Sequence, residues 1–237
     1  MKKAIIILSS LSTMAMAANY TWVGPENGQW NVSSNWDINN GYYPQSDSDH
    51  AFIGDNKSVI WSGGDYYGAS NSITLGQNSV LSLTKGGDIA VNTFTIGRNS
   101  VVNWTNEYAL GYHKDRNVTI NYGTFTVDSY GQFNATTGQK LWYNGNKVTL
   151  NGVLDFAEVD PGEGTIKLYT LNGGVDGLNI DYSGLQVINT NDRITYEIKQ
   201  ENNGVSIAYK VAPVPEPATA TLSLMALAGL AARRRRR

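Results

Sequence analysis

Short runs in which apolar and polar residues alternate cover most of the chain, and Gly, Asn or Pro separate them. Alternation with a period of two is typical of strands that bury one face. Few stretches longer than ten residues lack a turn former, so long helices are not expected in the body. In residues 194–211, apolar residues alternate on both sides of Asn202-Asn203-Gly204, which predicts a hairpin. The pattern predicts an all-β protein.

Two segments of this pattern align without gaps at a spacing of 21 residues: TLGQNSVLSL from Thr74 and TIGRNSVVNW from Thr95. The matched pairs are Thr74/Thr95, Gly76/Gly97, Asn78/Asn99, Ser79/Ser100 and Val80/Val101. Gly131 and Gly152 are again 21 residues apart. A β-rich repeat of this length predicts stacked coils with a shared core, a short right-handed β-helix-like solenoid that the hairpin caps. A β-sandwich built from hairpins remains the alternative, because it uses the same alternation and turns.

The N-terminal residues have the three parts of a secretory signal peptide. Lys2 and Lys3 precede an apolar stretch over residues 4–14, and Ala15-Met16-Ala17 fits the small-residue cleavage rule. We expect the Sec translocon to export the chain, and signal peptidase to cut after Ala17. Residues 1–17 would then be removed, and Ala18 would become the first residue.

The charge of the body differs from that of the whole chain, whose formal net charge is −2. Residues 18–212 hold 11 basic and 19 acidic side chains, a net charge of −8. An acidic body argues against nucleic-acid binding, which needs basic surface for phosphate contacts. The chain has no cysteine, so the exported protein depends on core packing and backbone hydrogen bonds.

The C-terminal residues combine three prolines, a short apolar stretch and a basic end. Residues 218–232 would span about 22 Å as a helix, which is short for a hydrocarbon layer of about 30 Å. We expect one short transmembrane helix there, with the C-terminus in the cytoplasm. The arginines that would fix this orientation are Arg233, Arg234, Arg235, Arg236 and Arg237.

Together these residues resemble the PEP-CTERM sorting signal of Gram-negative surface proteins. Its Pro-Glu-Pro box corresponds here to Pro215, Glu216 and Pro217. The resemblance implies that a membrane-embedded exosortase recognises the box and cleaves near it. The chain would then be anchored transiently in the inner membrane, and afterwards reach the cell surface or the extracellular matrix. In such proteins this sorting accompanies extracellular polysaccharide.

The segment from Tyr20 to Gly54 is rich in tryptophan, with Trp22, Gly28-Gln29-Trp30 and Asn35-Trp36, followed by Pro44 and Asp49-His50-Ala51-Phe52. It resembles the opening of bacterial surface β-helix proteins with autotransporter-associated β-strand repeats. Buried, these aromatics would cap the first coil. Exposed, they would stack on sugar rings, and the candidate glycan contacts are then Trp30, Trp36, Tyr42 and Tyr43.

Candidate chemistry is sparse. His50 and His113 are far apart in the sequence, so we expect no zinc site. On a strand, Asp47 with Asp49, or Glu158 with Asp160, would share a face about 7 Å apart, which suits a polysaccharide-cleaving enzyme. Asp47 and Asp49 could instead supply oxygen ligands to Ca²⁺. Both pairs are also typical of solvated surface acids, and we expect no cofactor.

The sequence therefore predicts four parts. These are a signal peptide (1–17), a Trp-rich N-terminal cap (18–60), a β-solenoid or other β-rich body (61–212) and a sorting signal (213–237). The function we expect is that of an exported, non-catalytic surface or matrix protein. A carbohydrate-binding module and a polysaccharide-active enzyme are the alternatives.

Overall fold

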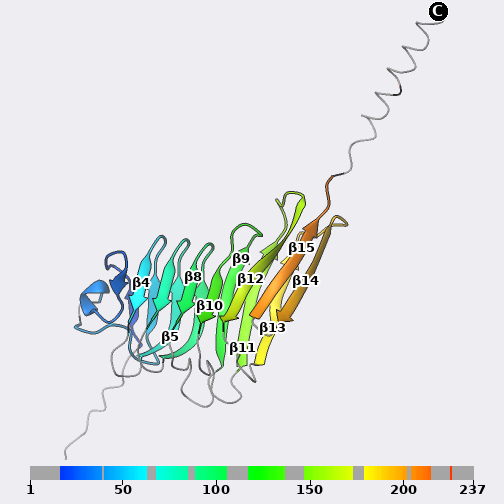
Figure 1. Ribbon diagram of the computed structural model, residues 1–237. Helices are drawn as coiled ribbons and strands as arrows, with labels where there is room; N and C mark the ends of the chain where they lie inside the picture. The colour runs from blue at the N-terminus through cyan, green and yellow to red at the C-terminus, as the bar shows by residue number, and fades with distance from the viewer. Residues whose placement is uncertain are drawn as a thin grey trace, which may run out of the picture.

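The protein forms two β-sheets whose strands stack along one long axis, from the N-terminal end to the C-terminal end (Figure 1). The structure is a computed structural model. It describes residues 17–38, 40–62, 68–84, 89–105, 117–136, 147–172, 179–201, 204–214 and 225.

Successive strands alternate between the two sheets up to β13. The seven-stranded sheet has the order β1 (Asn19–Thr21), β3 (His50–Ile53), β5 (Gly68–Leu75), β7 (Ile89–Ile96), β9 (Val118–Phe125), β11 (Lys147–Asp155), β13 (Asn179–Ile188). The eight-stranded sheet has the order β14 (Ile194–Glu201), β15 (Gly204–Val211), β12 (Gly162–Asn172), β10 (Gln132–Thr136), β8 (Val101–Trp104), β6 (Val80–Leu83), β4 (Ser58–Trp61), β2 (Gly28–Gln29). A 3-10 helix, η1, covers Ser33–Asn35.

Neighbouring strands are parallel except at the C-terminal end, where β15 pairs antiparallel with both β12 and β14. The predicted hairpin is present as β14 and β15, with Ile194 opposite Val211 and Glu201 opposite Gly204. The all-β prediction is thus confirmed, with one parallel sheet and one mixed sheet.

The 21-residue repeat corresponds to direct strand neighbours. Thr74 lies opposite Thr95 in the seven-stranded sheet, and Val80 lies opposite Val101 in the eight-stranded sheet. The equivalence of Gly131 and Gly152 is wrong. Gly131 lies against Ile96 and Gly97 just before β10, whereas Gly152 lies within β11 of the other sheet. Later repeats are longer, so an equal spacing in the sequence no longer marks an equal place in the fold.

The core lies between the sheets and consists of inward-facing columns that run across strands. One column passes through Ala51, Ile73, Phe94, Ile120 and Leu150, all fully buried. The facing sheet contributes Val59, Leu81, Val102, Phe133 and Tyr169. Alternation along each strand thus becomes a continuous apolar stack.

The turns that lead from the seven-stranded to the eight-stranded sheet repeat one construction. Asn27, Asn56, Asn78 and Asn99 all have φ values of 55–57°. Asparagine tolerates this left-handed conformation better than most residues. The Asn78 amide donates to Asn56 Oδ1, and the Asn99 amide donates to Asn78 Oδ1, each at 3.2 Å. The turns are therefore tied to one another along the stack.

Candidate functional site

The predicted sorting segment begins where the last strand ends. β15 ends at Val211, and Ala212 is held by two hydrogen bonds to Arg193. Ala212 N–H donates to the Arg193 carbonyl (2.8 Å), and Arg193 Nε donates to the Ala212 carbonyl (3.0 Å). Pro213 and Val214 follow, and Val214 is 63% exposed. We call this pair of bonds the Ala212–Arg193 clamp.

Most of the sorting signal lies outside the described residues. This applies to the predicted recognition residues Pro215, Glu216 and Pro217, and to Arg233, Arg234, Arg235, Arg236 and Arg237. Met225 is the one described residue of the predicted transmembrane helix, and it is helical and exposed. Within the residues that the structure describes, no helix has the length and apolar character needed to cross a membrane. The predicted signal peptide (residues 1–17) lies outside the described residues, except for Ala17.

The N-terminal tryptophans pack into one aromatic cluster at the start of the core. The Trp30 ring stacks on Trp61 at a centroid distance of 4.5 Å, and meets Trp36 edge-on at 4.7 Å. Trp22 also contacts Trp36 edge-on, at 5.2 Å. Trp30 Nε1 donates to the Pro44 carbonyl, and Trp36 Nε1 donates to the Trp30 carbonyl. The indole N–H groups of Trp30 and Trp36 thus both donate to backbone carbonyls.

Burial separates the four candidate glycan contacts. Trp30 is 0% exposed and Trp36 is 3% exposed, so neither indole offers a free face for a sugar ring. Tyr43 is partly buried against the core. Tyr42 is 57% exposed and is the one of the four whose ring is open to solvent.

Neither candidate acid pair lies on a strand, so neither has the shared strand face that would suit a polysaccharide-cleaving enzyme. Asp47 and Asp49 lie before β3; Asp47 is exposed and Asp49 is buried. Glu158 and Asp160 lie in the turn between β11 and β12, where Asp160 is exposed. Among the described residues, no group of three or more His, Asp or Glu could hold a metal ion.

The Asp49 carboxylate is surrounded by backbone N–H groups. Its Oδ2 accepts from Gln45 N–H (3.1 Å) and Ser46 N–H (2.9 Å), and its Oδ1 accepts from Ala18 N–H (3.3 Å). Both carboxylate oxygens of Asp49 thus accept hydrogen bonds from the backbone. The sequence showed Asp49 only as half of an acid pair, because the contact with Ala18 spans 31 residues.

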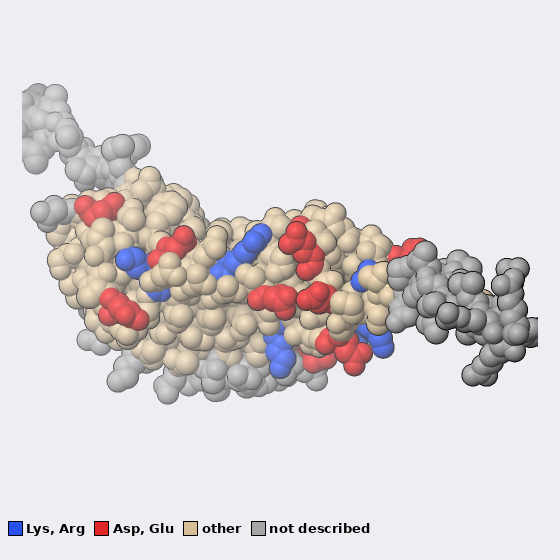
Figure 2. All heavy atoms as spheres, turned by 90° about the horizontal axis from the view of Figure 1, so that it is seen from above, with Lys and Arg blue, Asp and Glu red and all other residues tan. Residues whose placement is uncertain are grey.

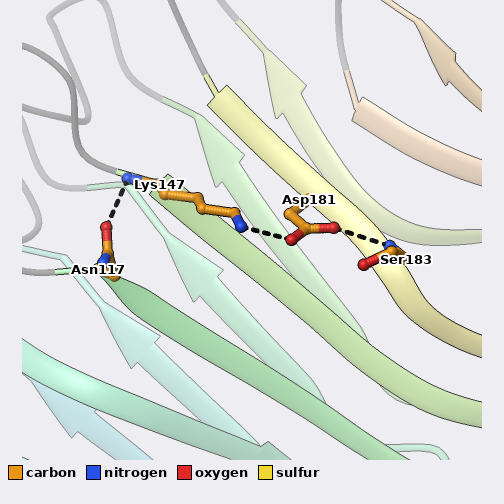
Figure 3. Close-up of polar contacts among 4 residues, drawn as sticks. All are labelled: Asn117, Lys147, Asp181 and Ser183. Atoms are coloured by element: carbon orange, nitrogen blue, oxygen red, sulfur yellow. Dashed lines mark hydrogen bonds and ion pairs between the residues drawn. The ribbon is translucent and has the colours of Figure 1, made fainter.

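An ion pair crosses two neighbouring strands on the outer face of the seven-stranded sheet (Figure 3). Lys147 at the start of β11 contacts the Asp181 carboxylate on β13. Asp181 also accepts from Ser183 N–H at 2.9 Å. The Lys147 ammonium, and after it Ser183, hold the pKa of Asp181 well below its ordinary value. Both side chains are partly exposed, so this is a surface ion pair, which solvent and salt screen.

The same outer face carries two columns of neutral hydrogen-bonding side chains. In register across four strands they are Ser72, Thr93, Thr119 and Thr149, and beside them Thr74, Thr95, Asn121 and Asn151. The Asn151 amide donates to Asn121 Oδ1 at 3.0 Å. Strands lie about 4.8 Å apart, so hydroxyl and amide groups recur at that spacing.

Charged residues on the face shown in Figure 2 are scattered, with acidic and basic side chains interspersed and no continuous basic area among the described residues. On this face, the described residues therefore show no concentration of positive charge.

A comparison with protein-family models finds the PEP-CTERM protein-sorting motif over residues 213–237. The predicted sorting signal is thereby confirmed in both its place and its kind. The motif implies an exported protein that an exosortase recognises and that is processed at the membrane. No curated protein and no solved structure matches the chain, so no homologue supports the autotransporter-like resemblance of residues 20–54.

Proposed function

We propose that this is a non-catalytic β protein of the cell surface or extracellular matrix, carried there by its exosortase-recognised tail. The sorting motif over residues 213–237 is the observation that carries the proposal. The body ends in a defined strand, and the exposed Val214 follows it, which suits recognition of the adjacent Pro-Glu-Pro box.

Before processing, we propose that residues 218–232 cross the inner membrane and that Arg233–Arg237 stay in the cytoplasm. The prolines of residues 213–217 favour extended backbone outside the helix, in the form that a protease binds. Cleavage near Glu216 would then release the body for attachment to the matrix.

The architecture supports a structural role. We interpret the alternation of parallel strands between two sheets as the coils of a short solenoid, with the tryptophan cluster covering its first coil. The candidate catalytic acids either lie in a turn or are engaged by backbone N–H groups, which favours a non-catalytic body over a polysaccharide-cleaving enzyme.

The test is a single substitution in the sorting box. In a strain that carries the exosortase, Glu216→Ala should leave the protein uncleaved in the inner membrane, whereas the parent chain reaches the surface. Glu201→Ala is the matched control, because Glu201 is exposed at the end of β14 and lies outside the motif. Surface display of Glu216→Ala at the level of the control contradicts the proposal.

A second candidate is binding of a neutral polysaccharide on the outer face of the seven-stranded sheet. The two hydroxyl and amide columns favour it, because sugars are recognised largely through their hydroxyl groups. On a glycan array, the full chain should bind a glycan that a double variant, Thr93→Val with Thr95→Val, no longer binds. Ser82→Val on the eight-stranded sheet is the control. Equal binding by both variants, or no binding by the parent, would contradict glycan binding on this face. The structural role would then be the one proposal that remains.

A further inference from the structure

Asp49 is the one acidic or basic side chain that is buried within the part of the chain that the structure describes. It is 4% exposed, and the other buried polar side chains are serines. Lys147, Lys199 and Lys210 form ion pairs with other acids. Within the described residues, the Asp49 carboxylate is therefore held by N–H dipoles, with no cation among its contacts.

A positive charge next to this buried carboxylate would add to the stabilisation that its N–H donors supply. Desolvation of an ion costs several kcal/mol unless an opposite charge and hydrogen bonds compensate for it. Two backbone N–H groups on Oδ2 supply part of that compensation. The remaining oxygen, Oδ1, faces the nitrogen of Ala18 at 3.3 Å, which is within the range of an ion pair.

Ala18 is the residue that signal-peptide cleavage is expected to expose as the new N-terminus. In the uncut chain, its nitrogen belongs to a neutral amide with a single N–H. Its carbonyl accepts from His50 N–H at 2.8 Å, and Asn19 continues into β1 opposite His50. Ala17 is exposed, whereas Ala18 is half-buried. The sheet therefore holds the Ala18 carbonyl, and this keeps the Ala18 nitrogen close to Asp49 Oδ1.

We propose that cleavage of the signal peptide creates the counter-ion of Asp49 and thereby locks the N-terminal end of the folded protein. Water adds across the Ala17–Ala18 peptide bond. The C–N bond breaks, the oxygen of water ends on Ala17 as a carboxylate, and the Ala18 nitrogen takes up protons to become an ammonium. The inference rests on the export part of the proposed function and does not depend on the exosortase.

The ion pair would connect three parts of the N-terminal end. The Asp49 side chain holds the backbone at Gln45 and Ser46, and would hold Ala18 at the start of β1. The Asp49 carbonyl accepts from Asn71 N–H at 2.7 Å, on β5. Cleavage would replace the neutral N–H of Ala18 by an ammonium beside the carboxylate, and so would strengthen the connection between Asp49 and the start of β1.

The experiment compares two mature N-termini of the full chain, exported from its own signal peptide in a Gram-negative host that lacks the exosortase. One chain is the parent; the other has Gly-Ser inserted between Ala17 and Ala18, which moves the ammonium away but keeps the Ala18 N–H. Mass spectrometry of the N-terminal peptide should identify Ala18 as the first residue of the parent. Any other first residue overturns the proposal.

Both N-termini are then combined with Asp49→Asn and, as a control, with Asp160→Asn in an exposed turn. The insertion should lower the Tm by about 4 °C when Asp49 is present and by less than about 1 °C in Asp49→Asn. With Asp160→Asn the full drop should remain. An insertion effect of equal size in the parent and in the Asp49→Asn variant, or none in either, overturns the proposal.

A second measurement needs no Asp49 variant and applies even if Asp49→Asn does not fold. Acetylation of the α-amine by an N-hydroxysuccinimide ester at pH 7 requires the unprotonated amine, and an ion pair that raises its pKa by about one unit reduces that form about tenfold. The Ala18 amine of the parent should react about tenfold more slowly than the glycine amine of the insertion chain. Equal rates overturn the proposal. If the exported chain shows the ion pair but the Glu216→Ala variant is displayed on the surface like its control, this inference stands and the sorting proposal fails.

Discussion

Gly97→Ala is expected to destabilise the protein by forcing two turns of the stack apart. A Cβ at position 97 would lie 2.6 Å from the carbonyl oxygen of Gly76, 2.7 Å from its carbonyl carbon and 2.9 Å from the Leu75 oxygen. These are main-chain atoms of the preceding turn and cannot rotate away. Gly97 N–H donates to the Leu75 carbonyl at 3.0 Å. A methyl group at position 97 would push this carbonyl away and so lengthen the hydrogen bond.

Overpacking of this kind costs about 1–3 kcal/mol, and the backbone contacts place Gly97→Ala at about 2 kcal/mol or more. For a domain of this size, each kcal/mol shifts the Tm by about 2–4 °C, so we expect a drop of about 4–8 °C. Thermal unfolding of the full chain, followed by tryptophan fluorescence, measures it.

Gly54→Ala is the matched control, because Gly54 occupies the equivalent turn before β4 and a Cβ there meets no heavy atom within 4 Å. An alanine that fits stabilises by about 0.4–1 kcal/mol, since it restricts the unfolded chain. The two variants should therefore shift the Tm in opposite directions. Shifts of the same sign and similar size would refute the argument that the turns are stacked in contact.

Two further substitutions test the aromatic cluster and the exposed ion pair. Trp30→Ala removes a fully buried indole and should cost about 3–5 kcal/mol in the free energy of unfolding, whereas Tyr42→Ala should change it by less than about 0.5 kcal/mol; urea titration of both variants measures the difference. Asp181→Asn should lower the Tm at pH 7. Because Lys147 depresses the pKa of Asp181 in the folded state, its stabilisation is present above about pH 4 and is lost as the pH falls further, so the Tm difference from the parent should vanish in acid and shrink in about 1 M salt. A difference that stays constant from about pH 7 to about pH 2 contradicts this assignment.

The sequence predicted the regular part of the fold because that part repeats. The pairs Thr74/Thr95 and Val80/Val101 are strand neighbours, since short turns of equal length keep the spacing at 21 residues. The repeat could not be followed further. Thr119 pairs with Thr93 at a spacing of 26 residues, and Thr149 pairs with Thr119 at 30. Longer connections between strands increase the spacing of paired residues in the sequence, whereas the strands still pair side by side in the same order.

The contacts that define the two ends of the body could not be predicted, because they depend on pairs distant in sequence. No local pattern marks Arg193 as the partner of Ala212, or Asp49 as the partner of Ala18. The sorting motif, in contrast, is read as a linear sequence by another protein, so its order and spacing in residues 213–237 were sufficient to identify it.

The place of β15 in its sheet determines how the body carries mechanical load. The strand that leads to the sorting segment is flanked on both sides, by β12 and by β14, and the residue that follows it, Ala212, is clamped to Arg193. Tension applied at the tail enters along this strand and loads two ladders of hydrogen bonds in shear, so that many bonds resist together. β1, by comparison, is a three-residue edge strand with a partner on one side only. A pull on the C-terminus would thus act first on a strand that is hydrogen-bonded on both sides.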